Sequence, residues 1–264
     1  MEKLLLLAGI FLLISMLFSM IGMGGGILYV PILLFAGYSM KIAPGISLIL
    51  IMSTSLAALF HFQKNRKVDW KLALVIDPPT DIMAFVGGYF STLIPEAALQ
   101  GLLAAILLLA SVLMIKNRTT SSVYQRPTKA WYWHRHFDGV DYSVNLPLVL
   151  TATAAIGVLV GMLGLTGGLI KLPIMVLLCG VPMDIAIATS TIMVTLTAFS
   201  GLIGHAMQGN VDWRTGLTLA LAAVIGGLIG SRISLKTDKT KLKRVFGFIV
   251  LLIALQIIYK LISQ

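Results

Sequence analysis

The chain contains few charged residues for its length. Aspartate, glutamate, lysine and arginine make up 11% of the 264 residues, whereas roughly a quarter of an ordinary soluble domain is charged. Hydrophobic residues make up 58%, and long apolar stretches recur along the chain. A helix crosses the hydrocarbon core of a bilayer with about 20 mostly apolar residues, and several stretches reach that length. The scarcity of charge therefore predicts an all-α polytopic membrane protein.

Cysteine is also scarce. Cys179 is the single cysteine and lies within an apolar stretch, which excludes a disulfide framework and a thiolate metal cluster. No Walker motif is present, and the histidines do not have metal-ligand spacing. We therefore expect no cofactor, no metal and no use of ATP.

Positive charge outweighs negative charge, and the net charge is +10. A net charge of this size would suit a nucleic-acid-binding protein, but 15 of the 20 lysines and arginines fall in three loops. Those loops contain Lys64, Arg66, Lys67 and Lys71; Lys116, Arg118, Arg126, Lys129 and Arg135; and Arg232, Lys236, Lys239, Lys241, Lys243 and Arg244. Basic clusters beside apolar spans mark the cytoplasmic side of membrane proteins. The charge pattern predicts a multi-pass protein of the cytoplasmic membrane and no nucleic-acid partner.

The first 21 residues resemble a secretory signal in composition. Lys3 precedes an apolar stretch, but no small-x-small cleavage site ends it. We expect this segment to remain as a membrane helix.

The sequence contains an internal repeat. Gly22–Pro31 matches Gly164–Pro173 in its first glycine, its inner glycine pair and its final proline. Val68-Asp69-Trp70 returns as Val211-Asp212-Trp213 at nearly the same distance along the chain. Because these motifs occur in the same order in both parts of the chain, they predict two related halves.

The landmarks divide the chain into a first membrane repeat (residues 1–115), a polar cytoplasmic linker (116–145) and a second membrane repeat (146–264). A long apolar segment interrupted by glycines begins each repeat, and three plainer spans follow it. The glycine-rich segments are expected at 4–36 and 146–180, and the plainer spans at 42–60, 71–91, 97–115, 184–204, 214–231 and 244–260.

The path of the glycine-rich segment decides the topology. If it crosses the membrane once, the halves are parallel and the basic loops fall on opposite faces. If it turns back as a re-entrant helix pair, the halves are inverted and the loops share one face, with 15 positive residues against four on the other. The bias of lysine and arginine toward the cytoplasmic face favours two inverted repeats.

The two glycine clusters are expected to break helices inside the membrane, where irregular backbone is tolerated around an enclosed cavity. Helices that begin after them would direct free N–H groups and a partial positive charge at a bound anion. Glycines often serve only for helix contact, and hydroxyl groups often bond to their own helix. A dinucleotide-binding fingerprint does not fit, because no strand precedes the glycines. The predicted substrate-binding residues are Gly22, Gly24, Gly25, Gly26, Ser47, Gly164, Thr166, Gly167, Gly168, Lys171 and Ser190.

Three ionisable residues lie within apolar spans, where such groups are costly and often functional. Lys171 would either neutralise a bound anion or extend to the membrane interface. Asp77 and Asp81 are one helical turn apart and would share a face. They are candidates for proton coupling, with the alternative that Asp77 caps a kinked helix.

The sequence resembles the TauE/SafE sulfite exporter family of bacterial and archaeal membrane proteins. The resemblance rests on Gly22–Pro31, Gly164–Pro173, Ala188-Thr189-Ser190 and Gly226-Gly227 with Gly230. The first half departs from the pattern, with Ala43-Pro44-Gly45-Ile46-Ser47 in place of Ala-Thr-Ser. The resemblance implies transport of sulfite or organosulfur anions such as sulfonates.

Together these features predict a secondary transporter, not an enzyme, that carries a small sulfur oxyanion or organosulfonate by alternating access. A channel-like anion pathway is the main alternative. An intramembrane enzyme with Asp77 and Asp81 as an acid pair fits less well, because both acids lie on one predicted helix. The expected partners are the substrate and the lipid bilayer, with a homodimer as an open arrangement.

Overall fold

The fold is a bundle of apolar helices. The computed structural model of the chain describes residues 2–22, 24–115, 131–165, 167–234 and 239–262. Within those ranges, six helices are long and apolar enough to cross a membrane. They are α1 (Glu2–Ser19), α3 (Ala43–Lys64), α6 (Glu96–Ile115), α7 (Leu146–Leu163), α9 (Met183–Met207) and α10 (Trp213–Ser234). The predicted polytopic, mainly helical membrane protein is confirmed.

Shorter helices complete the bundle, together with the longer α11. They are α2 (Gly26–Phe35), α4 (Trp70–Ile76), α5 (Pro78–Phe90), a 3-10 turn (Ser91–Leu93), α8 (Gly168–Pro173), a π-helical turn (Ile174–Leu178) and α11 (Lys239–Ile262). The single span expected at 71–91 is interrupted at Asp77, between α4 and α5. Pro78 and Pro79 follow, and a proline lacks the N–H group for a helical bond and disfavours helix in the residue before it.

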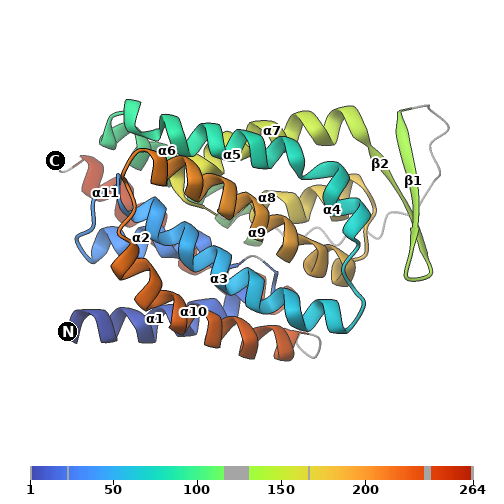
Figure 1. Cartoon of the computed structure of the whole chain (residues 1–264), viewed down its shortest axis with the longest axis horizontal. Helices are drawn as coiled ribbons and strands as arrows, with labels where there is room; N and C mark the ends of the chain where they lie inside the picture. Colours follow the sequence, from blue (N-terminus) through green and yellow to red (C-terminus); the bar gives the residue numbers. More distant parts are fainter. Residues whose placement is uncertain (1, 23, 116–130, 166, 235–238, 263–264) are drawn as a thin grey trace.

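The two ends of the bundle differ in what they carry. Both termini lie at one end, and a β-hairpin lies beyond the other (Figure 1). Helix α1 starts at the end with the termini, whereas α7 follows the hairpin and starts at the opposite end (Figure 1).

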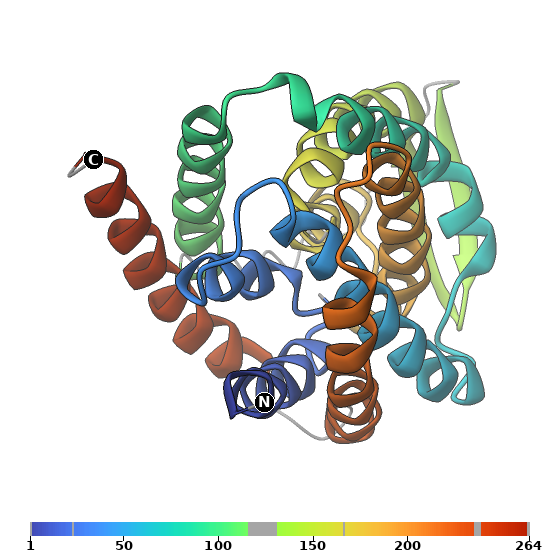
Figure 2. The ribbon, with the colours of Figure 1, turned by 60° about the vertical axis from the view of Figure 1, so that its left-hand side comes forward.

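Helices α3 and α9 form the centre of the bundle. The apolar spans of α3 and α9 are 78% and 83% buried, against 33% to 44% for the other four long helices. They pack against each other, while α1 packs on α10 and α7 packs on α5. Helix α11 lies beside α6 at the edge of the bundle (Figure 2). The outer helices present large apolar side chains such as Leu5, Leu221 and Leu252 to the surroundings, as a lipid-facing surface requires.

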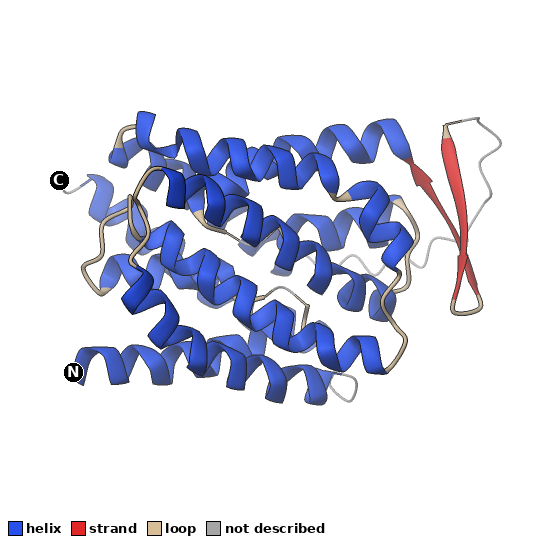
Figure 3. Ribbon diagram, viewed as in Figure 1, coloured by secondary structure: helices blue, strands red, loops and turns tan. Residues whose placement is uncertain are grey.

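The end of the predicted polar linker is a β-hairpin. Strands β1 (Tyr132–Phe137) and β2 (Val140–Asn145) form an antiparallel hairpin (Figure 3). Within the described ranges, these two strands make up all of the β-structure. From Trp133 to Phe137, partly buried and exposed residues alternate along β1, a pattern typical of a strand with two different faces. The prediction of an all-α protein is therefore wrong for this segment. Residues 116–130 of the linker lie outside the described residues.

Candidate functional site

The first glycine break separates α1 from α2. Gly22, Gly24 and Gly25 have φ values of 71°, 65° and 80°, in the left-handed region that residues with a side chain rarely adopt. A Cβ atom on Gly22 would lie 2.6 Å from the carbonyl oxygen of Ile187. The chain therefore turns in close contact with α9, and α2 begins at the buried Gly26.

The second glycine break separates α7 from α8. Gly164 has a φ of 64°, and a Cβ atom there would lie 2.4 Å from the Cα atom of Pro44 on α3. Helix α8 begins at Gly168. Thr166, which was predicted to bind substrate, lies outside the described residues. The helix breaks occur where the glycine clusters predicted them, and each break packs against a central helix of the other half.

The two aligned serines each hold the break of the opposite half. Ser190 on α9 donates to the carbonyl oxygen of Gly22 at 2.7 Å. Ser47 on α3 donates to the carbonyl oxygen of Gly164 at 2.6 Å. Both serines are fully buried. The Ser190 hydroxyl group shares its proton with the Ile187 carbonyl oxygen of its own helix at 2.8 Å, and both serine oxygens retain acceptor capacity. Their predicted contact with substrate stays a prediction.

Tyr29 and Lys171 occupy corresponding places beside the breaks. A Cβ atom on Gly25 would lie 2.4 Å from the Tyr29 hydroxyl oxygen, and one on Gly167 would lie 3.3 Å from Lys171 Nζ. The Tyr29 hydroxyl group also bonds to Thr54 at 2.9 Å. Each side chain thus turns back from its short helix toward the glycines that precede it.

Lys171 is part of a buried polar network. Its ammonium group forms an ion pair with Asp77 and donates to the Thr197 hydroxyl group at 2.8 Å. Thr197 in turn donates to Asp81 Oδ1 at 2.8 Å. The side chain of Lys171 is 0% exposed and that of Asp77 is 1% exposed. Lys171 therefore does not extend to the membrane interface, and the network joins the three ionisable residues singled out from the sequence.

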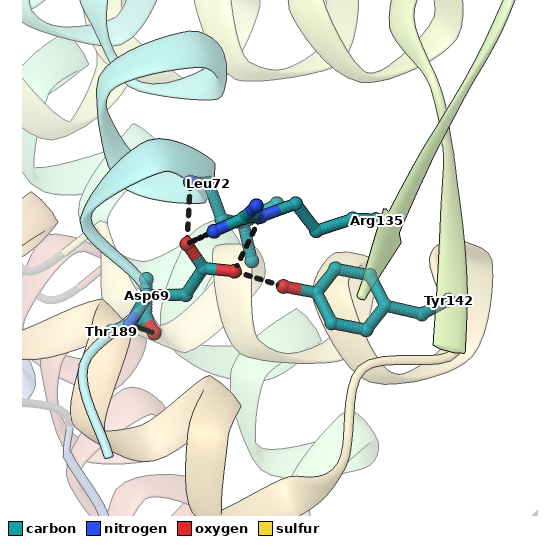
Figure 4. A network of polar contacts seen from close by, with 5 residues as sticks. All are labelled: Asp69, Leu72, Arg135, Tyr142 and Thr189. Carbon is teal, nitrogen blue, oxygen red and sulfur yellow. Dashed lines mark hydrogen bonds and ion pairs between the residues drawn. The ribbon is translucent and has the colours of Figure 1, made fainter. Parts of the chain in front are cut away.

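A second network connects the hairpin to the helices. Asp69, at the start of α4, accepts two bonds from the Arg135 guanidinium group at 3.0 Å and one from the Tyr142 hydroxyl group (Figure 4). It also accepts from the Leu72 N–H group, and its own N–H group donates to Thr189 on α9 at 3.0 Å. The hairpin is thereby fixed to the residue that precedes Ser190.

The charge state of Asp69 follows from these contacts. Burial favours its neutral form, but the hydrogen bonds from Arg135 and Tyr142 outweigh burial and lower the pKa of the carboxyl group. Asp212, the aligned residue, instead accepts from the Thr215 N–H and hydroxyl groups at 3.0 and 2.6 Å. From the sequence, Asp69 was only a repeat landmark, Arg135 was only one member of a basic loop, and Tyr142 had no predicted role.

Comparisons with known proteins agree with this architecture. The sequence model described as sulfite exporter TauE/SafE matches residues 7–257. The chain is 27% identical over 253 residues to the probable membrane transporter protein YunE of Bacillus subtilis, covering 92% of each protein. It is 24% identical over 260 residues to the probable membrane transporter protein YfcA of Escherichia coli, covering 96% of this chain and 90% of that protein. A probable membrane transporter protein of Methanocaldococcus jannaschii is 26% identical over 251 residues, covering 88% of this chain and 86% of that protein. No solved structure gives a significant match.

Proposed function

The chain belongs to the sulfite exporter TauE/SafE family, and from that premise we propose that it is a secondary transporter for sulfite or a related small sulfur-containing anion. Membership of this family makes the protein a multi-pass membrane transporter and not an enzyme. The proposed sulfur chemistry of the substrate comes from the description of the family. The similar proteins of Bacillus subtilis and Escherichia coli are named only as probable membrane transporters.

Transport is proposed to proceed by alternating access between two inverted repeats, residues 1–115 and 146–264, each with a re-entrant helix pair. The reciprocal bonds of Ser47 and Ser190 support this arrangement, because aligned residues make equivalent contacts to opposite halves. The packing of α1 on α10 and of α7 on α5 supports it in the same way. One half would rock against the other around the two breaks.

The anion is proposed to bind at the two glycine breaks. The observation that carries this proposal is the position of Lys171, a fully buried ammonium group beside Gly167 in the second break. Glycine permits close approach of an anion to backbone N–H groups, and the lysine supplies charge in a region of low dielectric constant. Sulfite, sulfate, thiosulfate and sulfonates share the negatively charged oxygens that such a site recognises.

Asp77 and Asp81 are proposed to couple transport to the proton gradient. Both carboxyl groups contact the network of Lys171, Asp77 directly and Asp81 through Thr197. A proton that binds at either carboxylate would therefore change the charge that surrounds the anion site.

Flux measurements in liposomes test this function. The purified protein would be reconstituted, and uptake of sulfite, sulfate, thiosulfate and sulfonates measured with and without a pH gradient. We expect at least one of these anions to be carried and its uptake to respond to the gradient. Failure to carry any of them would refute the proposed substrate class.

A channel-like pathway would use the same helix breaks without alternating access. Counterflow separates the two functions, because unlabelled anion inside the liposomes accelerates uptake of labelled anion through a carrier but not through a channel. We expect counterflow.

A further inference from the structure

A carboxylate of the protein neutralises the charge of Lys171 at the position where the anion is proposed to bind. The Asp77 carboxylate pairs with the Lys171 ammonium group beside Gly167. The other hydrogen bond recorded for that ammonium group goes to Thr197, a neutral hydroxyl group. An incoming anion therefore meets a lysine whose charge is already neutralised by the protein.

The energetics of burial restrict how the two anions can share one lysine. Two opposite charges that are buried together compensate each other, whereas one buried charge without a partner costs several kcal/mol (about 3–5 when a partner is removed). If a transported anion takes the ammonium group while Asp77 stays ionised, one of the two negative charges lacks a partner. Protonation of Asp77 removes that excess charge.

We propose that Asp77 and the transported anion compete for the Lys171 ammonium group, and that a proton on Asp77 releases the lysine to the anion. The inference rests on the proposed transport function and gives its coupling step. One proton binds the carboxylate oxygen, the ion pair between Asp77 and Lys171 opens, and the anion forms a new ion pair with Lys171. Charge balances, because one proton and one negative charge of the anion enter together. A monovalent anion is then carried with one proton.

Asp77 has a second oxygen that can receive that proton. Oδ1 faces Lys171, while Oδ2 is buried and makes no hydrogen bond of standard geometry among the described residues, although Asp81 and Thr80 lie close enough to interact with the carboxyl group. The hydroxyl group of Thr80, one turn further along, is likewise buried and makes no hydrogen bond of standard geometry within the described part of the chain, and it lies beside the Asp77 carboxyl group. Buried polar atoms without partners are rare in stable proteins and often mark a functional group.

The remaining ionisable groups near Asp77 are few. Helix α8 contributes Lys171, α5 itself contributes Asp81 and Tyr89, and α4 contributes Lys71. Helix α9 contributes Asp184 and His205, while α7 has no ionisable residue. His205 contacts the Gly161 carbonyl oxygen at 2.9 Å. Within the network itself, Lys171, Asp77 and Asp81 are the ionisable members.

Among the described residues, the first glycine break has no buried ion pair that corresponds to Lys171 and Asp77. Tyr29 takes the place of Lys171 and bonds to Thr54, just as Lys171 bonds to Thr197. Helix α10 packs on α1 and contains no aspartate or glutamate, whereas the corresponding segment from α4 to α5 contains Asp77 between the two helices and Asp81 on α5. Proton competition is therefore assigned to the second break alone.

Proton uptake on anion binding tests the inference directly. The detergent-solubilised protein would be titrated in weak buffer with thiosulfate and with methanesulfonate, which stay ionised over the pH range of the assay. We expect about one proton to be taken up for each methanesulfonate bound. We also expect the apparent affinity to fall about tenfold for each unit that the pH rises once Asp77 is mainly ionised.

Asp77→Asn is the decisive variant, because asparagine resembles the neutral acid. It should bind the same anions with no proton uptake and no pH dependence, and in liposomes it should exchange anions without moving protons. Asp212→Asn, the same chemical change at the repeat counterpart of Asp69 before α10, should retain both properties. Proton uptake by Asp77→Asn equal to that of the unaltered protein would overturn the inference.

Two further outcomes distinguish a failure of this inference from a failure of the proposed transport function. If the unaltered protein exchanges anions but takes up no proton, the competition is refuted and the proposed transport function stands. If no anion of the panel is exchanged, the proposed function itself is refuted. Should Asp77→Asn fail to fold, the double variant Asp77→Asn with Lys171→Gln leaves neither charge buried alone. It should fold and lose anion binding at every pH, and pH-dependent binding by it would overturn the inference.

Discussion

Ser190 donates its hydroxyl proton to the carbonyl oxygen of Gly22 at 2.7 Å, so a central helix of the second half holds the glycine break of the first. Ser47 and Gly164 form the same contact in the opposite direction at 2.6 Å. The aligned serines therefore connect the two halves at the point where both chains leave helical geometry. In the proposed rocking movement, these bonds determine how firmly each break follows the opposite half.

Replacing either serine by alanine should loosen the corresponding break. Ser190→Ala and Ser47→Ala each leave a buried carbonyl group without its donor, which costs about 1–3 kcal/mol. We expect similar losses of thermal stability in detergent and slower anion exchange for both variants. Ser53→Ala is the matched control, because among the described residues Ser53 bonds only to the Ile49 carbonyl group of its own helix. Losses in the control as large as in the other two would contradict the role of the serines between the halves.

Close helix packing at two glycines should not tolerate a methyl group. A Cβ atom on Gly161 of α7 would lie 2.0 Å from the Ala84 carbonyl oxygen, and one on Gly230 of α10 would lie 1.9 Å from the Met16 carbonyl oxygen. Gly161→Ala and Gly230→Ala should each lower stability by about 1–3 kcal/mol through overpacking. Gly9→Ala, on an open surface of α1, is the control and should be neutral or slightly stabilising. Thermal unfolding measures all three, and an unchanged Gly161→Ala would show that the helices can separate freely.

The hairpin should be held by Asp69 at neutral pH and released in acid. The pKa of Asp69 is lowered in the folded protein. Its stabilising effect is therefore complete above the ordinary carboxyl pKa of about 4, and it is lost as the pH falls through the lower folded-state value. Arg135→Gln should cost about 2–3 kcal/mol near neutral pH, because Asp69 stays buried with fewer donors. The difference from the unaltered protein should shrink in acid.

Limited proteolysis of the hairpin and thermal unfolding across a pH series measure this effect. Lys67→Gln is the control, because Lys67 and Asp138 form an exposed ion pair at 2.5 Å, a type worth roughly 0–1 kcal/mol. A hairpin that is equally protected in Arg135→Gln and in the control would contradict the prediction.

Cysteine accessibility tests the proposed inverted orientation of the repeats. The two Val-Asp-Trp loops should lie on opposite faces of the membrane, although their sequences align. In a Cys179→Ser background, Asn65→Cys should react with a membrane-impermeant thiol reagent only from the cytoplasmic face. Gln208→Cys should react only from the other face. Reaction of both positions from one face would refute inversion and favour parallel halves.

The positions of the spans and of the helix breaks could be predicted from the sequence, because both are local properties. Apolar length alone indicated the long helices, and the glycines of Gly22–Gly26 and Gly164–Gly168 indicated the breaks. The inverted orientation of the repeats, which was inferred from the basic loops, stays a prediction. The β-hairpin was missed because its two strands are short and its partner, Asp69, is distant in sequence.

The chemistry of the site was only partly visible in the sequence. Lys171, Asp77 and Asp81 could be singled out, because ionisable residues are costly inside a membrane whatever their neighbours. Their pairing was not predictable, because 94 residues separate Lys171 from Asp77 and the pairing depends on which helix faces meet. The same holds for the bond between Ser190 and Gly22 across 168 residues.

The sequence by itself determined that this protein lies in a membrane, where its helices break and which charges it buries, because apolar length, glycine content and charge act within one segment. Tertiary structure alone decided that Asp77 neutralises Lys171, that each aligned serine holds the opposite break, and that Asp69 fixes the hairpin. These contacts form between side chains that only packing brings within hydrogen-bond distance, and no local pattern specifies them.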